Sequence, residues 1–121
     1  MNELQVNRLS GDVCAAPQLE PSVMQSVADA GFKSVINNRP DFEGGPSQPT
    51  SAEIEAAALA AGLAYAYLPV HPSLHTAEQI SQFATLLSTL PKPTLVFCRS
   101  GARSTKLFQA AQAISSAALR H

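Results

Sequence analysis

A short apolar segment that ends in a cysteine constrains this chain more than any other feature. The segment Thr94–Phe97 is followed directly by Cys98-Arg99-Ser100-Gly101-Ala102-Arg103-Ser104. Uninterrupted apolar residues are typical of a strand in the centre of a parallel sheet. The small and polar residues that follow predict a tight loop leading into a helix that begins near Ala102. We therefore expect the Cys98 thiol at the carboxyl end of a strand, facing a helix N-terminus.

The rest of the chain alternates strand-like and helix-like segments. This pattern predicts an α/β fold with a mainly parallel central sheet of four to five strands flanked by helices, formed as a single domain over residues 1–121. We expect strands at 4–9 (an edge strand), 32–37, 63–70 and 94–97, and helices at 21–30, 51–61, 77–90 and from 102 onward. Two capping boxes, Thr50 with Glu53 and Thr76 with Gln79, mark the starts of the second and third helices.

Open sheets of this kind bind ligands beyond the carboxyl ends of their strands. Three loops should meet there: the Cys98 loop, the Pro- and Gly-rich stretch 38–49, and the stretch that begins at His71. The sequence therefore predicts one pocket with Cys98 at its floor.

The charges are distributed unevenly along the chain. Residues 1–78 carry nine acidic and three basic side chains, whereas residues 79–121 carry five basic and no acidic ones. Arg99, Arg103 and Lys106 lie within eight residues of Cys98. Such a field attracts small anions and favours an ionised thiol. The alternative is chance clustering on a solvated helix face.

The loop residues have the chemistry of a nucleophile beside an anion. Gly101 lets the backbone curl so that N–H groups point inward, and the helix N-terminus adds positive potential. Arg103 can bind an oxyanion through two parallel hydrogen bonds, and Ser104 is expected to donate its hydroxyl to the Cys98 thiolate. The arrangement suits covalent catalysis. The alternative is a buried structural cysteine beside solvated arginines.

The stretch Cys98–Ser104 resembles the active loop of rhodanese-type sulfurtransferases, in which the cysteine carries a persulfide. It is also similar to the signature loop of cysteine-dependent tyrosine and dual-specificity phosphatases. Those enzymes place five residues between Cys and Arg, whereas this chain has four, from Arg99 to Ala102.

Together with Val35–Asp41 and Tyr67–Val70, most of residues 4–115 resembles one bacterial family. This is the phosphatase-like domain that accompanies beta-lactamase-like hydrolases, also described as sulfur transferases. The resemblance implies a dual-specificity-phosphatase-like fold. It also implies a partner, a persulfide dioxygenase of metallo-beta-lactamase fold.

We expect sulfur transfer through a Cys98 persulfide, because the shorter loop has one amide fewer to surround a phosphoryl group. Its substrate would be a small anionic sulfur donor. The substrate-binding residues would be Arg99, Ser100, Gly101, Ala102, Arg39, His71 and His75. The alternatives are a phosphatase acting on phosphate esters through a phosphocysteine, and a non-catalytic anion-binding module.

A phosphatase also needs a proton donor for the leaving alcohol. Asp41, His71 and His75 are the candidates, although either histidine could be an exposed loop residue and Asp41 a turn residue after Pro40. Arg39 either lies at the pocket rim, where it would steer an anion, or forms a surface salt bridge with Asp41 or Glu43. Cys14 is either a resolving thiol or, more simply, a semi-buried cysteine in the first loop.

Other classes of function are disfavoured. The net charge of −1 gives no general affinity for nucleic acid, and no apolar run could span a bilayer. The first ten residues do not have the pattern of a signal peptide, so we expect a cytoplasmic protein. Neither a metal nor a cofactor is expected.

Overall fold

The computed structural model describes residues 4–119 and contains one five-stranded sheet. Its strands are β1 (Asn7–Arg8), β2 (Val13–Ala16), β3 (Ser34–Asn37), β4 (Ala64–Tyr67) and β5 (Thr94–Phe97), in the spatial order β1-β2-β5-β3-β4. β1 pairs antiparallel with β2, and every other neighbouring pair is parallel. The predicted mainly parallel sheet is therefore confirmed, with β5 at its centre.

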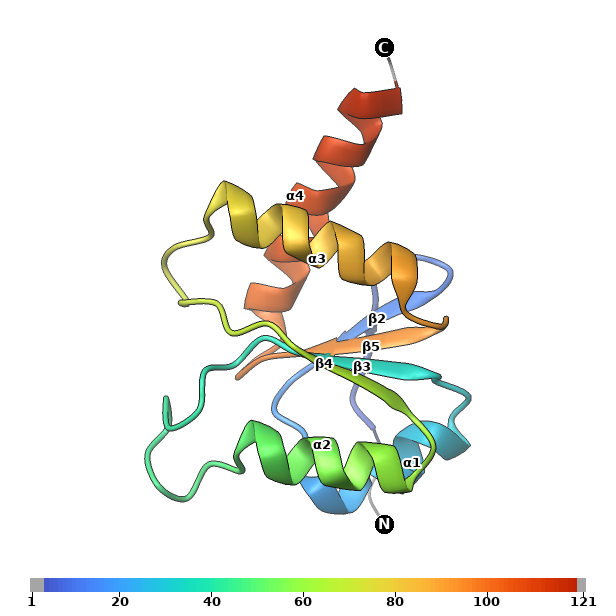
Figure 1. Cartoon of the computed structure of the whole chain (residues 1–121), viewed down its shortest axis with the longest axis vertical. Helices are drawn as coiled ribbons and strands as arrows, with labels where there is room; N and C mark the ends of the chain where they lie inside the picture. The colour runs from blue at the N-terminus through green and yellow to red at the C-terminus, as the bar shows by residue number, and fades with distance from the viewer. Residues whose placement is uncertain (1–3, 120–121) are drawn as a thin grey trace.

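Helices cover both faces of the sheet (Figure 1). One face carries α1 (Met24–Asp29), which follows a short 3₁₀ helix, η1 (Pro21–Val23), together with α2 (Ser51–Ala60). The other face carries α3 (Ala77–Thr89) and α4 (Ala102–Leu119). The result is a three-layer α/β/α arrangement in which α4 leads directly out of the Cys98 loop.

Two apolar clusters fill the space between the layers, because successive side chains on a strand point to opposite faces. On β5, Val96 belongs to the cluster beneath α3 and α4, whereas Leu95 and Phe97 belong to the cluster beneath α1 and α2. On β3, Ile36 and Val35 divide in the same way. The central strands are buried on both faces, which explains their apolar sequences.

Both predicted capping boxes are present. Thr50 accepts the Glu53 backbone N–H through its side chain while the Glu53 carboxylate accepts the Thr50 N–H, and Thr76 with Gln79 repeats the exchange at α3. Each box satisfies helix-end N–H groups that would otherwise lack partners. The starts of α2 and α3 are thereby fixed, and with them the lengths of the two loops that follow β3 and β4.

The structure corrects two sequence expectations. Cys14 lies in strand β2, not in a loop, and Leu95 of β5 is its partner in the register. The edge strand expected over residues 4–9 contracts to Asn7–Arg8, which is exposed. The sequence does not predict β2, because the four small residues between Asp12 and Pro17 show no clear alternation of apolar and polar side chains. Their pairing partner, β5, also lies far along the chain.

The parallel strands end at the same edge of the sheet, and this determines where the candidate site lies. Asn37 pairs with both Phe97 and Tyr67, and Phe97 pairs with Ala16, so the next residue of each strand begins a loop at the same edge of the sheet. Cys98 is the first residue after β5.

Among the helices of the described residues, no segment combines the length and apolarity needed to cross a membrane.

Replacing Phe83 with alanine tests the α3 side of the core. Phe83 is fully buried, so we expect the free energy of unfolding to fall by about 3–5 kcal/mol in a urea titration. Phe42→Ala is the matched control, because the Phe42 side chain is 64% exposed and its loss should change stability by less than about 0.5 kcal/mol. Equal losses for the two variants would contradict the placement of α3.

Candidate active site

The Cys98 thiol lies inside the loop that joins β5 to α4. Cys98 is 1% exposed, and its Sγ accepts the backbone N–H of Gly101 at 3.1 Å. Gly101 has a φ of +93°, and a Cβ there would lie 3.3 Å from the Ala16 carbonyl oxygen. Glycine is therefore needed both for the backbone conformation and for the close approach to β2. The loop therefore turns one backbone amide onto the sulfur.

Asn38 joins the strand ends to the start of α4. Its backbone N–H donates to Phe97 O, its side-chain amide donates to Leu68 O, and its Oδ1 accepts the Ser104 hydroxyl at 2.8 Å. Asn38 and Ser104 are both fully buried. The structure thus differs from the expectation for Ser104: its single hydroxyl proton goes to Asn38 and not to Cys98, because a buried amide oxygen would otherwise lack a donor.

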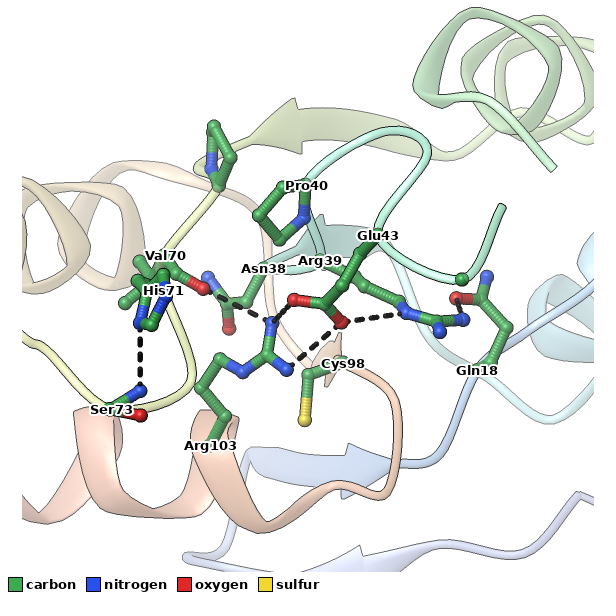
Figure 2. Close-up of polar contacts among 12 residues, drawn as sticks. Gln18, Asn38, Arg39, Pro40, Glu43, Val70, His71, Ser73, Cys98 and Arg103 are labelled. Atoms are coloured by element: carbon green, nitrogen blue, oxygen red, sulfur yellow. Dashed lines mark hydrogen bonds and ion pairs between the residues drawn. The ribbon is translucent and has the colours of Figure 1, made fainter. Parts of the chain in front are cut away.

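Arg103 reaches from the first turn of α4 back across the strand ends (Figure 2). Its side chain is only 7% exposed. Nη1 donates to Val70 O at 3.1 Å and pairs with Glu43 Oε2 at 3.1 Å, while Nη2 donates to Glu43 Oε1 at 3.1 Å. Nε is buried and has no partner among the described residues. One N–H of a buried guanidinium therefore lacks an acceptor.

Glu43 receives two arginines at once. Besides Arg103, Arg39 donates from Nε to Glu43 Oε1 at 2.9 Å, and its Nη1 donates to Gln18 Oε1. Gly44 leaves room for this arrangement, because a Cβ there would lie 2.6 Å from Nη2 of Arg39. Arg39 thus forms a salt bridge with Glu43, but this ion pair is largely buried and not on the surface as expected.

The two arginines determine the charge state of Glu43. Burial raises the pKa of its carboxyl, but the hydrogen bonds and positive charges of Arg103 and Arg39 outweigh burial and hold the pKa below its usual value. Glu43 is therefore an anion at neutral pH. Phe42, directly before it, has a φ of +63°, which is strained for a residue with a bulky side chain.

The proton-donor candidates lie in different settings. Asp41 Oδ1 accepts the Ser51 N–H at the start of α2, so this carboxylate serves the loop and the helix. His71 is exposed, and its Nδ1 accepts the Ser73 N–H (Figure 2). His75 is partly buried, and the charges of Lys106 and Arg103 act on it.

The remaining predicted residues lie on the rim of the loop. Arg99 and Ser100 are exposed, and the Ala102 N–H donates to Ser100 Oγ at 3.3 Å instead of pointing to the sulfur. Ser100, Gly101 and Ala102 line a cavity of about 840 Å³ between the N-terminal segment and the start of α4. Cys98 is not among the residues that line this cavity.

Sequence reasoning missed two residues of the site. Glu43 was considered only as a partner for Arg39, because nothing local in a Gly- and Pro-rich loop indicates a contact with a residue 60 positions away. Asn38 was noted only as part of the stretch after β3. The one available signal was a polar Asn-Asn pair at the end of an apolar strand.

Replacing Gly101 with alanine should damage both the fold and the loop. A non-glycine residue at this φ costs about 1–2 kcal/mol, and we expect the free energy of unfolding to fall by that amount in urea. The rate at which iodoacetamide alkylates Cys98 should change as well, because the Gly101 backbone N–H donates a hydrogen bond to the sulfur. Gly11→Ala is the control, since a Cβ at Gly11 meets nothing within 4 Å. If Gly101→Ala matched it, the loop geometry described here would be incorrect.

His75 should make stability depend on pH. Burial, together with the charges of Lys106 and Arg103, lowers its pKa from the ordinary value of 6.5. The unfolded chain therefore binds the His75 proton at a higher pH than the folded one, so this contribution weakens the fold as pH falls below the ordinary pKa of 6.5 and through the lowered pKa of the folded state. Over that range we expect wild type to lose stability relative to His75→Gln, measured by urea unfolding. Parallel pH curves would place His75 away from the two cations.

Comparison with known proteins extends the local resemblance to nearly the whole chain. The profile of the family described as "Beta-lactamase hydrolase-like protein, phosphatase-like domain" matches residues 5–115. A Beta-lactamase hydrolase-like protein from Xylella fastidiosa is 39% identical over 87 residues, covering 72% of this chain, and one from Agrobacterium fabrum is 35% identical over 89 residues, covering 74%. The aligned part is 20% of the length of each relative, so the chain corresponds to about a fifth of them.

Solved structures share the same architecture. A candidate phosphatase from Neisseria meningitidis superposes with a TM-score of 0.77 at 30% identity, covering 84% of this chain and 71% of that one. The active form of Tk-PTP superposes with a TM-score of 0.60 at 17% identity over 88% of this chain and 80% of that one, which shows the fold alone. The profile match, the relatives and the cysteine loop agree: this chain belongs to the phosphatase-like domain family of the Beta-lactamase hydrolase-like proteins.

Proposed function

We propose that the domain is a cysteine-dependent phosphatase that hydrolyses phosphate monoesters through a covalent intermediate on Cys98. The observation that carries the proposal is the position of the Cys98 sulfur, which accepts the Gly101 amide inside a loop closed by the buried Arg103. The phosphatase-like family and the Neisseria relative support this choice of reaction. The sequence alone favours sulfur transfer and leaves phosphate hydrolysis as the alternative.

The reaction has two steps. The Cys98 thiolate attacks phosphorus, an S–P bond forms, and the P–O bond to the leaving group breaks with its electron pair on the departing oxygen. Water then attacks phosphorus, the S–P bond breaks, and phosphate leaves as the thiolate is regenerated. The unpartnered Nε of Arg103 is available to hold a phosphoryl oxygen in both steps.

The setting of the candidate acids favours substrates with good leaving groups. Asp41 is engaged with Ser51, and His71 accepts an N–H from its own loop. Burial and the charges of Lys106 and Arg103 lower the pKa of His75, so it is a poor proton donor at neutral pH. A leaving group that departs as a stable anion needs no proton from any of the three. Aryl phosphates should therefore be hydrolysed faster than alkyl phosphates.

Sulfur transfer is the second candidate, and the spacing of the loop favours it. Four residues separate Cys98 from Arg103, which suits a single sulfur atom better than a tetrahedral phosphoryl group. The Cys98 thiolate would attack the outer sulfur of thiosulfate, forming a persulfide and releasing sulfite, and a thiol would then take the sulfur. A persulfide dioxygenase of metallo-beta-lactamase fold would be the natural partner for this reaction.

One pair of assays separates these functions. We expect wild-type protein to hydrolyse an aryl phosphate such as p-nitrophenyl phosphate, and Cys98→Ser to lose at least about 100-fold in rate, because the serine hydroxyl is not ionised at neutral pH. Cys14→Ser is the matched control and should keep the wild-type rate. A gain of one sulfur atom in the intact mass after incubation with thiosulfate, without phosphate release, would favour sulfur transfer instead. Absence of both reactions would exclude both.

A further inference from the structure

The anion-binding arginine of the site already holds an anion. Both terminal nitrogens of Arg103 contact the Glu43 carboxylate at 3.1 Å, and Figure 2 shows these two side chains meeting beside Cys98 at the end of β5. A substrate that binds Arg103 must displace this carboxylate or share the guanidinium with it. In both cases the negative charge of Glu43 opposes the negative charge of the substrate.

The loop that carries Glu43 is shaped to keep it there. Phe42 adopts a φ of +63° although its side chain is exposed, and Gly44 makes space for Arg39 on the other side. Arg39 donates to the carboxylate oxygen that Nη2 of Arg103 also contacts, so the carboxylate is held from two directions.

We propose that Glu43 is a specificity-determining residue that acts as an internal competitor for Arg103. The two arginines and Glu43 together carry a net charge of +1, and without the Glu43 charge they would carry +2. Glu43 therefore weakens the binding of dianions more than the binding of monoanions, since Coulomb energy scales with the product of the charges. The proposal rests on the proposed function only in placing the substrate anion at Arg103.

The test measures the binding of inert anions, so it does not depend on turnover. Wild type and Glu43→Gln are titrated with sulfate, a dianion, and with nitrate, a monoanion, at pH 7.5 and constant ionic strength, and the Gly101 amide is followed by NMR. Glutamine keeps the size and a hydrogen-bonding oxygen while removing the charge. We expect Glu43→Gln to bind sulfate about tenfold more tightly and nitrate about threefold more tightly, because the logarithmic gain doubles with the charge of the ligand.

Glu55→Gln is the matched control. It removes the same formal charge from an exposed position on α2 and should leave both affinities within about twofold of wild type. Unchanged or weaker sulfate binding by Glu43→Gln would overturn the proposal, because Glu43 would then only orient Arg103. Equal gains for sulfate and nitrate would also overturn it.

A second variant covers the case in which Glu43→Gln does not fold. In Glu43→Ala, free acetate can occupy the position that the carboxylate leaves between Arg39 and Arg103. We expect acetate to weaken sulfate binding to this variant in proportion to its concentration, with little effect on wild type. Sulfate binding indifferent to acetate would contradict the competition. If the protein binds anions as expected but turns over neither aryl phosphate nor thiosulfate, the proposed function fails while this inference stands.

Discussion

The site is organised by the need to neutralise a buried guanidinium. Arg103 keeps its charge at any physiological pH, and its side chain is 7% exposed, so it requires acceptors wherever it lies. The chain supplies Val70 O from the loop after β4 and Glu43 from the loop after β3. One arginine on α4 thereby fixes two loops that leave neighbouring strands, and the Cys98 loop is held against both of them.

A second set of buried hydrogen bonds, centred on Asn38, joins the same elements. Asn38 binds β5 through its backbone, the loop after β4 through its amide, and α4 through the Ser104 hydroxyl. Such a network stabilises a single arrangement when every member is satisfied. The hydroxyl at position 104 therefore fixes the angle at which α4 leaves the loop, and this angle determines where Arg103 can reach. Ser104 therefore contributes to the site indirectly, through its hydrogen bond to Asn38 and not through the Cys98 sulfur.

The elements that could be predicted from sequence are those with local signals. The strand before Cys98 is apolar throughout, the glycine in the loop is required by its backbone conformation, and both capping boxes exchange hydrogen bonds over three residues. β2 was missed because Val13–Ala16 is short and becomes a strand only by pairing with β5. Glu43 was missed as a partner of Arg103 for the same reason: its role is a contact between loops, and the acid lies in a segment without periodicity.

The distribution of charge around Cys98 follows from these contacts and differs between the two sides of the site. On the side that faces the loop after β3, Glu43 offsets one of the two positive charges of Arg39 and Arg103. Lys106 lies one turn along α4 from Arg103, and both cations act on His75. The positive charge that the C-terminal third of the sequence predicts is therefore reduced on the side of Glu43, and Lys106 adds to it on the α4 side. The Nε of Arg103 is buried and has no partner among the described residues, so an anion could reach it only if the neighbouring side chains moved aside.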